Sequence, residues 1–427
     1  MKKYESYKII SEPWIGNIPS HWIKSRVGRH FKIERGRVIS KEEIQDNIGD
    51  YPVYSSQTSN NGELGRISTY DFDGEYVTWT TDGEKTGTCF HRTGKFNTTN
   101  VCGMLSVRES TPYSLKYLNY YLNQVTRPYV RLDINPKLMN NMMSEIPLVI
   151  PSIQEQHQIV QFLDEKTELI DKLISTKERK ISLLKEQRTS FINQVVTKGL
   201  NPNVKMKDSG VDWIGEIPEH WIKSKVKYVS IIFGRIGYRG YTVEDIVSEG
   251  EGVITISPSN IKNDIFTIEG ENTFLSFEKY EESPEIQIFT NDIILVKTGS
   301  TIGKTSIIPC DVPKMTINPQ LVVLKELKID NKYFYYQTVC EYFKKSFLVE
   351  QTGSTTPTIS QEKINGFPIL IPSRQEQCQI VEYIDSKTKE IDDLIQLEQK
   401  KIDLLKEYRQ SLISEVVTGK IKVTTDE

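Results

Sequence analysis

The residues best able to do chemistry in this chain are basic side chains gathered in two stretches. Residues 24–37 hold six lysines and arginines against one acid, Glu34, and residues 223–239 hold five basic residues and no acid. Such side chains donate to phosphate oxygens, which suits a nucleic-acid backbone. The formal net charge of −3 argues against this ligand unless basic residues are concentrated locally, and here they are. The candidate DNA-binding residues in these stretches are Arg26, Arg29, Lys32, Arg35, Lys225, Lys227, Arg235, Tyr238 and Arg239.

A second group of candidates lies in turns rich in serine, threonine, asparagine, glutamine and lysine. A single turn of this composition is more often simply exposed to solvent. Together with the basic stretches, however, these turns supply many groups able to reach phosphates and base edges. The DNA-binding candidates here are Tyr54, Ser55, Ser56, Gln57, Thr80, Asp82, Lys85, Asn260, Lys262, Lys297, Ser300, Thr301, Lys304, Ser354, Thr355 and Thr356.

Catalytic motifs are missing from the sequence. The segments at Asn135-Pro136 and Asn318-Pro319 lack the second proline and the aromatic residue of an adenine methyltransferase, and no HExxH or GxSxG occurs. Residues 299–305, GSTIGKT, have three residues where a phosphate-binding loop has four before GK. The five cysteines form no CxxC pair, which argues against a disulfide framework or a structural zinc. The sequence therefore predicts neither catalytic residues nor a bound metal.

These candidates must be positioned by a long segment that occurs twice, from Ile146 and from Phe367, with roughly half of the aligned positions identical. In each copy a serine, Ser152 or Ser373, is followed three residues later by glutamate, which predicts a helix N-cap with a capping box. Apolar residues then recur along a heptad seam, which predicts a helix of about 45 residues that needs a partner helix. The simplest partner is the other copy, although an ordinary long core helix is the alternative.

A short box precedes each of two domain-sized regions: PWIGNIPSHW at residues 13–22 and DWIGEIPEHW at residues 212–221. The two regions share little sequence, and both show strands with a helix, expected around residues 115–124 and 332–348. A duplicated frame with unlike inserts suggests two modules that do the same job on different targets. The expected boundaries are 1–23 for the first box segment, 24–145 for the first globular domain, 146–200 for the first helical region, 201–222 for the linker and second box, 223–366 for the second globular domain and 367–427 for the second helical region.

This arrangement resembles the specificity subunit of Type I restriction-modification enzymes. The PSxQEQ segments at residues 151–156 and 372–377, the two WIGxIPxHW boxes and their order carry the resemblance over essentially the whole chain. The stretch NDIILVKTGSTIGK in the second insert is also similar to that family's target recognition domains. The resemblance implies an α+β fold. Two target recognition domains, each with a mixed sheet and short helices, would be joined by two long helices in an antiparallel coiled coil with a pseudo-twofold internal repeat.

The resemblance also implies a non-catalytic subunit that reads an asymmetric, bipartite target on double-stranded DNA. The implied partners are two modification subunits, which use S-adenosylmethionine to methylate adenine at N6, and two translocase-nuclease restriction subunits. The chain itself would hold no cofactor. With no signal peptide and no apolar run of membrane-spanning length, we expect it in the cytoplasm. The candidate subunit-interface residues open the two helices: Gln154, Glu155, Gln156, Gln375, Glu376 and Gln377.

Two other functions remain open at this point. A self-contained DNA methyltransferase or nuclease would need a motif that the sequence lacks, and S-adenosylmethionine binding by the isolated chain would favour it. A coiled-coil scaffold with two modules for protein or glycan also fits the repeat. A DNA affinity of the assembled complex that falls steeply with salt would argue against that scaffold.

Overall fold

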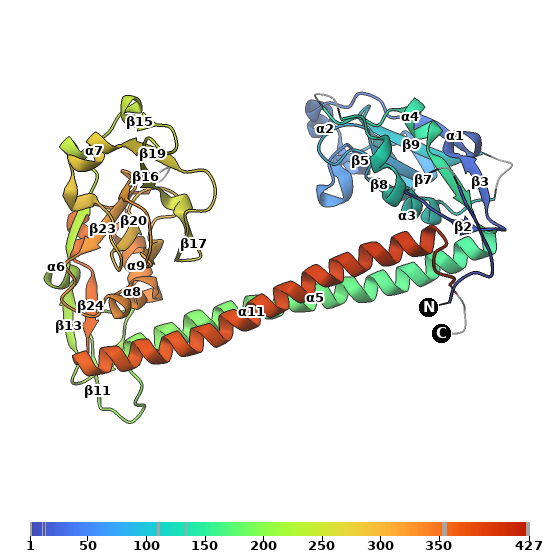
Figure 1. Cartoon of the computed structure of the whole chain (residues 1–427). Coiled ribbons are helices and arrows are strands. Elements are labelled where there is room, and N and C mark those ends of the chain that lie inside the picture. The colour runs from blue at the N-terminus through green and yellow to red at the C-terminus, as the bar shows by residue number, and fades with distance from the viewer. Residues whose placement is uncertain are drawn as a thin grey trace. The chain divides into compact units, whose positions relative to one another are not determined.

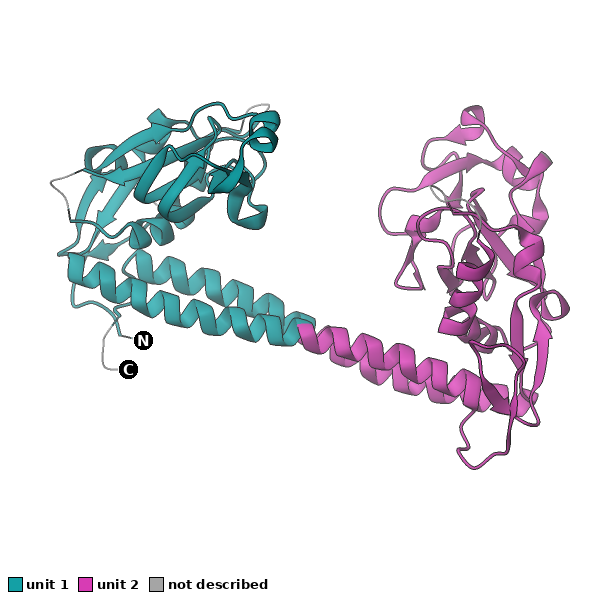
Figure 2. Ribbon diagram, turned by 180° about the vertical axis from the view of Figure 1, so that it is seen from behind, with its two compact units in different colours: residues 1–178, 399–427 teal, residues 179–398 magenta. Residues whose placement is uncertain are grey.

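The computed structural model describes residues 2–10, 12, 14–108, 112–132, 135–351 and 357–423. The chain divides into two compact units, each with a globular part and half of each long helix (Figure 1, Figure 2). Unit 1 consists of residues 1–178 and 399–427, and unit 2 consists of residues 179–398.

The globular part of unit 1 is built mainly of strands. Its strands are β1 (Tyr7–Lys8), β2 (Ile18–Pro19), β3 (Ile23–Arg26), β4 (Phe31–Arg35), β5 (Ile48–Tyr54), β6 (Glu63–Ile67), β7 (Phe72–Thr80), β8 (Cys89–Thr98), β9 (Cys102–Val107) and β10 (Pro147–Ile150). Its helices are α1 (Val27–His30), α2 (Lys41–Asp46), α3 (Leu115–Val125) and α4 (Asn140–Glu145), with short 3-10 turns η1 (Ser59–Gly62) and η2 (Arg127–Tyr129).

The globular part of unit 2 has more and shorter elements. Its strands are β11 (Met206–Asp208), β12 (Glu216–Pro218), β13 (Ile222–Lys225), β14 (Ile231–Gly234), β15 (Ile246–Val247), β16 (Gly252–Ile256), β17 (Ile261–Lys262), β18 (Ile265–Phe266), β19 (Thr273–Ser276), β20 (Ile293–Val296), β21 (Thr305–Ile307), β22 (Met315–Ile317), β23 (Leu321–Lys325) and β24 (Pro368–Ile371). Its helices are α6 (Val226–Val229), α7 (Phe277–Glu281), α8 (Asn331–Val339), α9 (Glu341–Glu350) and α10 (Gln361–Asn365), with 3-10 turns η3 (Gly237–Arg239), η4 (Val243–Asp245), η5 (Pro258–Asn260) and η6 (Pro284–Ile286).

The two long helices are α5 (Ile153–Lys198) and α11 (Arg374–Val417), as the heptad pattern predicts. In unit 1, Arg409 of α11 donates to both carboxylate oxygens of Asp171 in α5, at 2.9 and 3.2 Å. In unit 2, Arg188 of α5 pairs with Asp392 of α11 at 3.1 Å. Because a late residue of one helix meets an early residue of the other, the helices run antiparallel within each unit. The two ion pairs are equivalent in the repeat, so each copy supplies the same acid to the arginine of the other.

The predicted seam is buried. Leu163 and Thr167 of α5 and Leu412 of α11 are at most 5% exposed in unit 1. The Thr167 hydroxyl donates to the carbonyl of Leu163 at 2.6 Å, so this polar group is satisfied inside the seam. Thr388 occupies the equivalent position in unit 2 and makes the equivalent bond at 2.8 Å.

Each long helix begins at its predicted N-cap serine, and α5 has both hydrogen bonds of the predicted capping box. Ser152 accepts from the backbone nitrogen of Glu155 at 3.2 Å, and the Glu155 carboxylate accepts from the backbone nitrogen of Ser152 at 3.2 Å. The same carboxylate lies 3.0 Å from Nε2 of His21 and accepts from the Trp22 indole at 3.4 Å. The first box is thus fixed to the start of α5.

The start of α11 repeats this arrangement in unit 2. Glu376 lies 3.0 Å from Nε2 of His220 and accepts from the Trp221 indole at 3.0 Å. The strand that follows each box then pairs antiparallel with the strand that precedes each long helix, β3 with β10 and β13 with β24. The beginning and the end of each globular part therefore meet beside the helices.

Both globular parts contain the same four-stranded core. Unit 1 has a six-stranded sheet in the order β4-β9-β7-β8-β5-β6, and unit 2 has sheets in the orders β14-β23-β20-β21 and β15-β19-β16-β22. The strands β4-β9-β7-β8 and β14-β23-β20-β21 correspond one to one, and all neighbours in both sets are antiparallel. Each unit also has one parallel pair: β5 pairs with the core strand β8 in unit 1, and β16 pairs with β22 in the second sheet of unit 2. The predicted α+β fold with mixed sheets is confirmed.

One predicted helix is wrong in its extent. The stretch expected as one helix over residues 332–348 forms α8 and α9, with Cys340 between them in an extended conformation (φ −70°, ψ 154°). The break lets α9 turn Phe343 and Phe347 towards Phe367, with ring centroids 5.3 and 4.9 Å away. Tertiary packing, which the local apolar pattern does not encode, decides this break.

Replacing Glu155 by glutamine should destabilise unit 1. The amide lacks the negative charge with which the carboxylate accepts hydrogen bonds from His21, from Trp22 and from the backbone at the helix cap. Burial alone would raise the pKa of Glu155, but hydrogen bonds from His21, Ser152 and Trp22 outweigh it, so the pKa lies below its usual value. A depressed pKa stabilises the folded state above the unfolded-state pKa, near 4.3, and this contribution is lost as pH falls through the folded-state pKa.

We expect Glu155→Gln to lower the free energy of unfolding at neutral pH by about 1–2 kcal/mol, with a smaller difference in acid, in urea denaturation at several pH values. Glu165→Gln is the control on the same helix, since its exposed carboxylate accepts from Gln161 at 3.0 Å and from no other side chain among the described residues. An equal loss in both variants would contradict the role given to Glu155.

Candidate nucleic-acid interface

Three loops meet at one end of the core sheet in each unit. They are residues 55–58, 81–86 and 99–101 in unit 1, and residues 257–260, 297–302 and 318–320 in unit 2. We call each set the loop cluster of its unit. Backbone bonds join the second loop to the third: Thr81 donates to Val101 at 3.3 Å, and Lys297 donates to Gln320 at 2.8 Å. In unit 1 the Ser56 hydroxyl also donates to the carbonyl of Val101, which brings the first loop to the same place.

The middle loop is the same hairpin in both units. Thr80 at its base donates to the carbonyl of Thr88 at 3.0 Å and accepts from Gly87 at 2.9 Å. Its counterpart in unit 2, Val296, makes the same two bonds at 2.8 and 2.9 Å. A strand follows each hairpin, so residues 299–305 do not form the strand-to-helix turn of a phosphate-binding loop, as the sequence spacing predicts.

The hairpins share a backbone but differ in their side chains. Gly83 has φ +93° and Gly299 has φ +109°, values that residues with a side chain rarely adopt. The tip of the first hairpin carries charged groups, whereas the tip of the second carries neutral hydroxyls. The residues are Asp82, Glu84 and Lys85 in unit 1 and Thr298, Ser300 and Thr301 in unit 2. One platform thus presents two different sets of hydrogen-bonding groups.

The loop cluster of unit 2 encloses a hollow of about 390 Å³. Hydroxyl, amide and ammonium groups line it. The lining residues are Ser257, Pro258, Ser259, Thr298, Gly299, Ser300, Thr301, Lys304 and Gln320. Burial lowers the pKa of Lys297 beside this hollow. Such a set can donate to and accept from base edges, and Lys304 adds a positive charge.

An arginine buried in the protein supports a loop in each unit. Arg92 of β8 is 3% exposed, lies 3.6 Å from the Tyr54 ring centroid and donates to the carbonyl of Asn61 at 2.7 Å. Arg235 is 2% exposed and donates to the carbonyls of Ile317 and Arg239, both at 2.6 Å. Burial lowers the pKa of both guanidinium groups. No ion pair joins either one to a carboxylate within the described ranges, so each unit carries a buried positive charge below its loops.

The structure brings together ten of the residues predicted from sequence. Each of them lies in a loop cluster or directly beside it. They are Tyr54, Ser55, Ser56, Gln57, Asp82 and Lys85 in unit 1 and Lys297, Ser300, Thr301 and Lys304 in unit 2. Thr80 and Asn260 belong to the same region but are 1% and 5% exposed, so their side chains support the loops from inside.

The basic stretches behave differently from the loops. In β4, Arg35 lies opposite Gly103 and is at the cluster end of the sheet, while Lys32 lies opposite Ser106 at the other end. The basic residues that precede β4 and its counterpart β14 also lie at the end of the core sheet far from the loop cluster. They are Arg26, Arg29, Lys225 and Lys227. Several are engaged already: Arg26 pairs with Glu145, Lys32 with Glu34 and Arg239 with Glu285. Lys262 is exposed in β17.

Most of the predicted subunit-interface residues at the start of the long helices make hydrogen bonds within their own unit. Gln156 is fully buried and accepts from the backbone of Ser114 at 2.9 Å, and Gln377 is 3% exposed and accepts from the backbone of Asp330 at 2.9 Å. Glu155 and Glu376 hold the boxes as described above. Of this predicted group, Gln154 and Gln375 have exposed side chains.

Some residues lie outside the sequence prediction or outside the described part of the chain. Ser354, Thr355 and Thr356 are among the residues that the structure does not describe, as is the side chain of Tyr238. Ser257, Ser259, Glu84 and Gln320 belong to the loop clusters but were not predicted. The spacing TDGEKTG in the first hairpin, matched by KTGSTIG in the second, was the signal that could have revealed Glu84. No such repeated spacing marks Ser257, Ser259 or Gln320.

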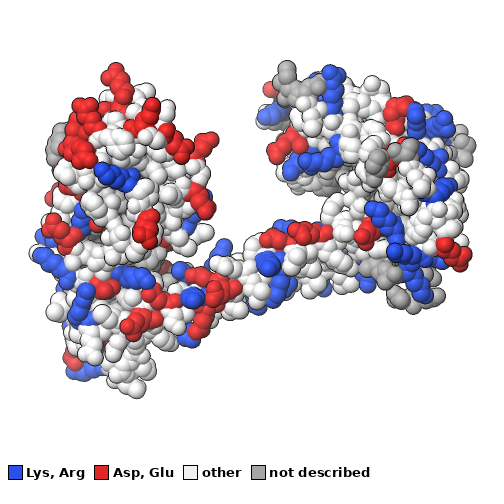
Figure 3. Space-filling view, in the orientation of Figure 1, with Lys and Arg blue, Asp and Glu red and all other residues white. Residues whose placement is uncertain are grey.

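Charge is distributed unevenly over the surface of unit 2. Acidic side chains gather around β15 and α7, where Figure 3 shows several groups of red side chains. The exposed acids there are Glu244, Glu249, Glu251, Glu278, Glu281 and Glu282. A polyanion such as DNA is repelled from this surface. Among the described residues, no group of three histidine, cysteine or acidic side chains could hold a metal ion. No helix within the described ranges is long and apolar enough to cross a membrane.

A model of the Type I restriction modification DNA specificity domain matches residues 19–183 and, a second time, residues 248–407. The chain belongs to this family. Each match includes the loop cluster of one unit and most of one long helix. It is therefore a DNA-specificity subunit with two recognition domains, and its family is one without catalysis of its own.

Individual relatives agree with this family. A type I specificity subunit N-terminus from Mycoplasma pneumoniae is 50% identical over 133 residues, which are 31% of this chain and 71% of that relative. Another subunit of that organism is 45% identical over 157 residues, and the chain spans 41% of its length. The MjaVIII specificity subunit of Methanocaldococcus jannaschii is 25% identical over 95% of this chain and 94% of its own.

A solved structure shows the same fold. A chain from a type I R-M system, solved in a study of complex assembly and conformational transition, matches with a TM-score of 0.70. The match covers 95% of this chain and 99% of that one at 14% sequence identity. The two chains thus share a fold although most of their side chains differ.

Proposed function

We propose that this subunit reads an asymmetric, bipartite DNA sequence, one half-site with each loop cluster, and directs adenine-N6 methylation and restriction there. The observation that carries the proposal is the pair of equivalent hairpins, at residues 81–86 and 297–302, with one backbone geometry and different side chains. Equal platforms place side chains against a duplex in the same way, while unlike side chains select different base pairs.

The direct contacts are proposed at polar groups of the loop clusters, with Gln57, Asp82 and Lys85 in unit 1 and Ser300, Thr301 and Lys304 in unit 2. Lys85 and Ser300 are exposed, and the other four are half-buried. The acidic surface around β15 and α7 faces away from the duplex in this proposal, because it would repel phosphates. The recognition domains correspond to residues 24–145 and 223–366, the helical regions to 146–200 and 367–427, and the boxes to 1–23 and 201–222.

Two modification subunits complete the methyltransferase, bind S-adenosylmethionine and carry the catalytic residues, and two restriction subunits join them. This chain binds no cofactor and works in the cytoplasm with the DNA. Exposed apolar side chains on the long helices support two docking surfaces, one in each unit. Unit 1 exposes Leu169, Leu173, Leu404 and Tyr408 by 48–57%, and unit 2 exposes Leu183, Leu394 and Leu397 by 43–54%.

The repeat relates these two surfaces. Leu173 of copy one corresponds to Leu394 of copy two, and Leu183 corresponds to Leu404. Each unit therefore offers one leucine of each equivalent pair, on two antiparallel helices. Exposed apolar side chains that lie together on a protein surface are typical of a site that a partner covers. Two equivalent surfaces favour two copies of one partner.

Single-molecule sequencing of DNA from cells that express this chain with its modification subunit tests the proposed function. We expect a bipartite methyladenine motif with two unlike half-sites, present only when the chain is expressed. The modification subunit alone is the control. If it is expressed and bound to this chain but produces no chain-dependent methylation, the proposal fails.

Gly299→Ala should disturb only the half-site read by unit 2. The added methyl group has room, since its nearest neighbour is Nε2 of Gln320 at 3.5 Å, so the effect comes from the φ of +109°. Holding alanine in such a conformation costs roughly 1–3 kcal/mol, and the hairpin relaxes to another shape. The measurement is the methylated motif and the DNA affinity of the assembled methyltransferase.

Gly270→Ala is the matched control for this change. Gly270 has φ +106°, nothing within 4 Å of its added methyl group, and a place in unit 2 outside the loop cluster. It should cost similar stability and leave the motif unchanged. A motif that changes equally in both variants would show that strain, and not the hairpin, alters recognition.

Leu173→Asp combined with Leu404→Asp should remove the apolar surface of unit 1. Two buried leucines contribute about 1.5 kcal/mol each to binding, so the affinity of that site for a modification subunit should fall about a hundredfold. Sedimentation or native mass spectrometry of the complex measures the loss. Ile9→Asp is the control, because Ile9 is 86% exposed in unit 1 and lies off the helices.

A further inference from the structure

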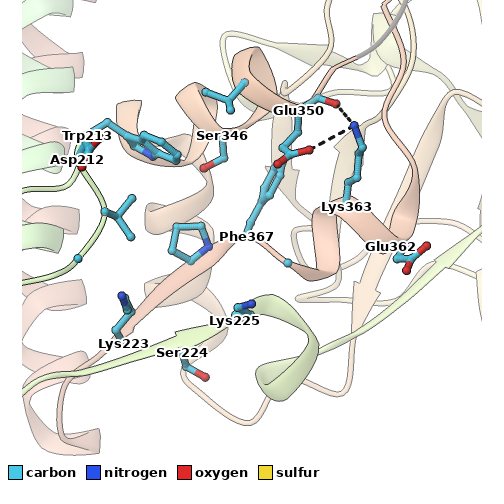
Figure 4. Close-up of a pocket in the computed structure, with 15 residues that line it drawn as sticks. Asp212, Trp213, Lys223, Ser224, Lys225, Ser346, Glu350, Glu362, Lys363 and Phe367 are labelled. Atoms are coloured by element: carbon cyan, nitrogen blue, oxygen red, sulfur yellow. Dashed lines mark hydrogen bonds and ion pairs between the residues drawn. The ribbon is translucent and has the colours of Figure 1, made fainter.

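A cavity of about 570 Å³ lies in unit 2 beside the second box (Figure 4). Its walls are formed by residues 210–213 at the start of the box, strand β13, the end of α9 and the turn from α10 into β24. Part of the lining is apolar, from Trp213, Val349 and Phe367. Val349 is 58% exposed, and the neighbouring Leu348 is 67% exposed, so apolar side chains also stand at the edge of this cavity.

Several donors that line the cavity are unused. Lys223 and Lys225 of β13 have no ion-pair or hydrogen-bond partner within the part of the chain that is described. The indole nitrogen of Trp213 is buried and also lacks a partner there. The third lysine, Lys363, is engaged: Figure 4 shows it joined to Glu350, whose carbonyl is 2.7 Å and whose carboxylate is 3.2 Å away. The cavity therefore offers two ammonium groups and one N–H group to an acceptor from outside.

The equivalent basic residues of unit 1 are neutralised within that unit. Lys24 pairs with Glu12 at 2.6 Å, and Arg26 pairs with Glu145. These two positions correspond in the repeat to Lys223 and Lys225. The two glutamates, however, correspond to Val211 and Gly366.

Unit 2 has thus kept both cations and lacks both carboxylates. Lys223 and Lys225 are exposed, so the loss of these acceptors leaves their ammonium groups available to an acceptor from outside. The indole N–H of Trp213 is buried without an acceptor among the described residues, which is costly unless a group from outside supplies one. The absent acceptors and the cavity lie at the same place. An external group with the chemistry of the missing glutamates fits both facts.

We propose that this cavity receives an acidic side chain, carried on an apolar segment, of the modification subunit that docks on unit 2. A carboxylate can accept from Lys223, Lys225 and the indole of Trp213, while apolar neighbours cover Val349 and Phe367. This inference rests on the proposed function, and it adds a contact that unit 1 does not offer.

The charge of the lining favours a protein segment over DNA. The walls hold three lysines and three carboxylates, the latter from Asp212, Glu350 and Glu362. A duplex binds through many phosphates and needs an excess of positive charge along its path. One acidic side chain needs only the two free ammonium groups. The exposed apolar edge, moreover, has no counterpart on a phosphate backbone.

Reversing the two free charges tests the proposal. In Lys223→Glu combined with Lys225→Glu, we expect the affinity of unit 2 for its modification subunit to fall roughly thirtyfold. Native mass spectrometry of the purified complex, at a concentration where the wild type holds two modification subunits, should then show one. Lys314→Glu with Lys328→Glu is the control, with the same change in charge on exposed lysines of unit 2 outside the cavity.

A second variant supplies the missing carboxylate from within the chain. Gly366→Glu copies Glu145 of unit 1, and the glycine has an ordinary φ of −83°. Its added Cβ would lie 3.2 Å from the carbonyl oxygen of Lys363, which requires only a small shift. The new carboxylate should occupy Lys225 and weaken binding about tenfold. Unchanged thermal unfolding would show that the variant is folded.

The outcomes separate this inference from the proposed function. A wild-type chain that binds no modification subunit contradicts the proposed function itself. A wild-type chain that binds two, together with both variants binding two at unchanged affinity, overturns the cavity proposal alone. Loss of DNA affinity by the lysine variant in the absence of modification subunits also overturns it, because the occupant would then be DNA.

Discussion

One carboxylate at the start of each long helix joins segments that are far apart in the sequence. Glu155 closes the capping box of α5 and accepts from His21 and Trp22 of the first box, and Glu376 at the start of α11 accepts from His220 and Trp221 of the second box. The end of the other helix arrives at the same point. A Cβ at Gly419, just beyond α11, would lie 2.3 Å from the Pro19 ring. In each unit the box is therefore packed at the start of one helix and the end of the other.

This frame leaves the loops free to differ. The order of the four core strands and the hairpin bonds at Thr80 and Val296 are the same in both units. Backbone hydrogen bonds and buried apolar side chains provide them, and neither depends on what the exposed loop residues are. A recognition domain built in this way can change its target without changing its fold.

The charges follow the same division. The whole chain has a formal net charge of −3, yet each unit keeps a buried arginine below its loops, Arg92 in unit 1 and Arg235 in unit 2. A buried charge that bonds to backbone carbonyls stays in place, whereas an exposed lysine is mobile and screened by salt. The acidic side chains of unit 2 gather around β15 and α7, away from the hollow in the loop cluster of unit 2. The positions of the charged residues, and not the net charge of the chain, make it suited to bind a polyanion.

The sequence alone determined the repeated helices, their capping boxes, the seam and the absence of catalytic motifs, because these depend on local patterns that recur every three to seven residues. It also indicated ten polar residues that the loop clusters bring together. It missed the shared core sheet, since strands β4-β9-β7-β8 and β14-β23-β20-β21 agree in topology and hydrogen bonding but hardly in side chains. The break at Cys340 was missed because packing around Phe367 decides it.

Only the tertiary structure separated supporting residues from exposed ones. Gln156, Asn260 and Arg235 have polar side chains in segments that the sequence marked as binding candidates. Each is nevertheless at most 5% exposed and makes its hydrogen bonds inside the protein. Composition cannot reveal this, because the same amide or guanidinium serves equally well to brace a loop or to contact a base. Which of the two it does depends on the segments that fold over it, and these are distant in the chain.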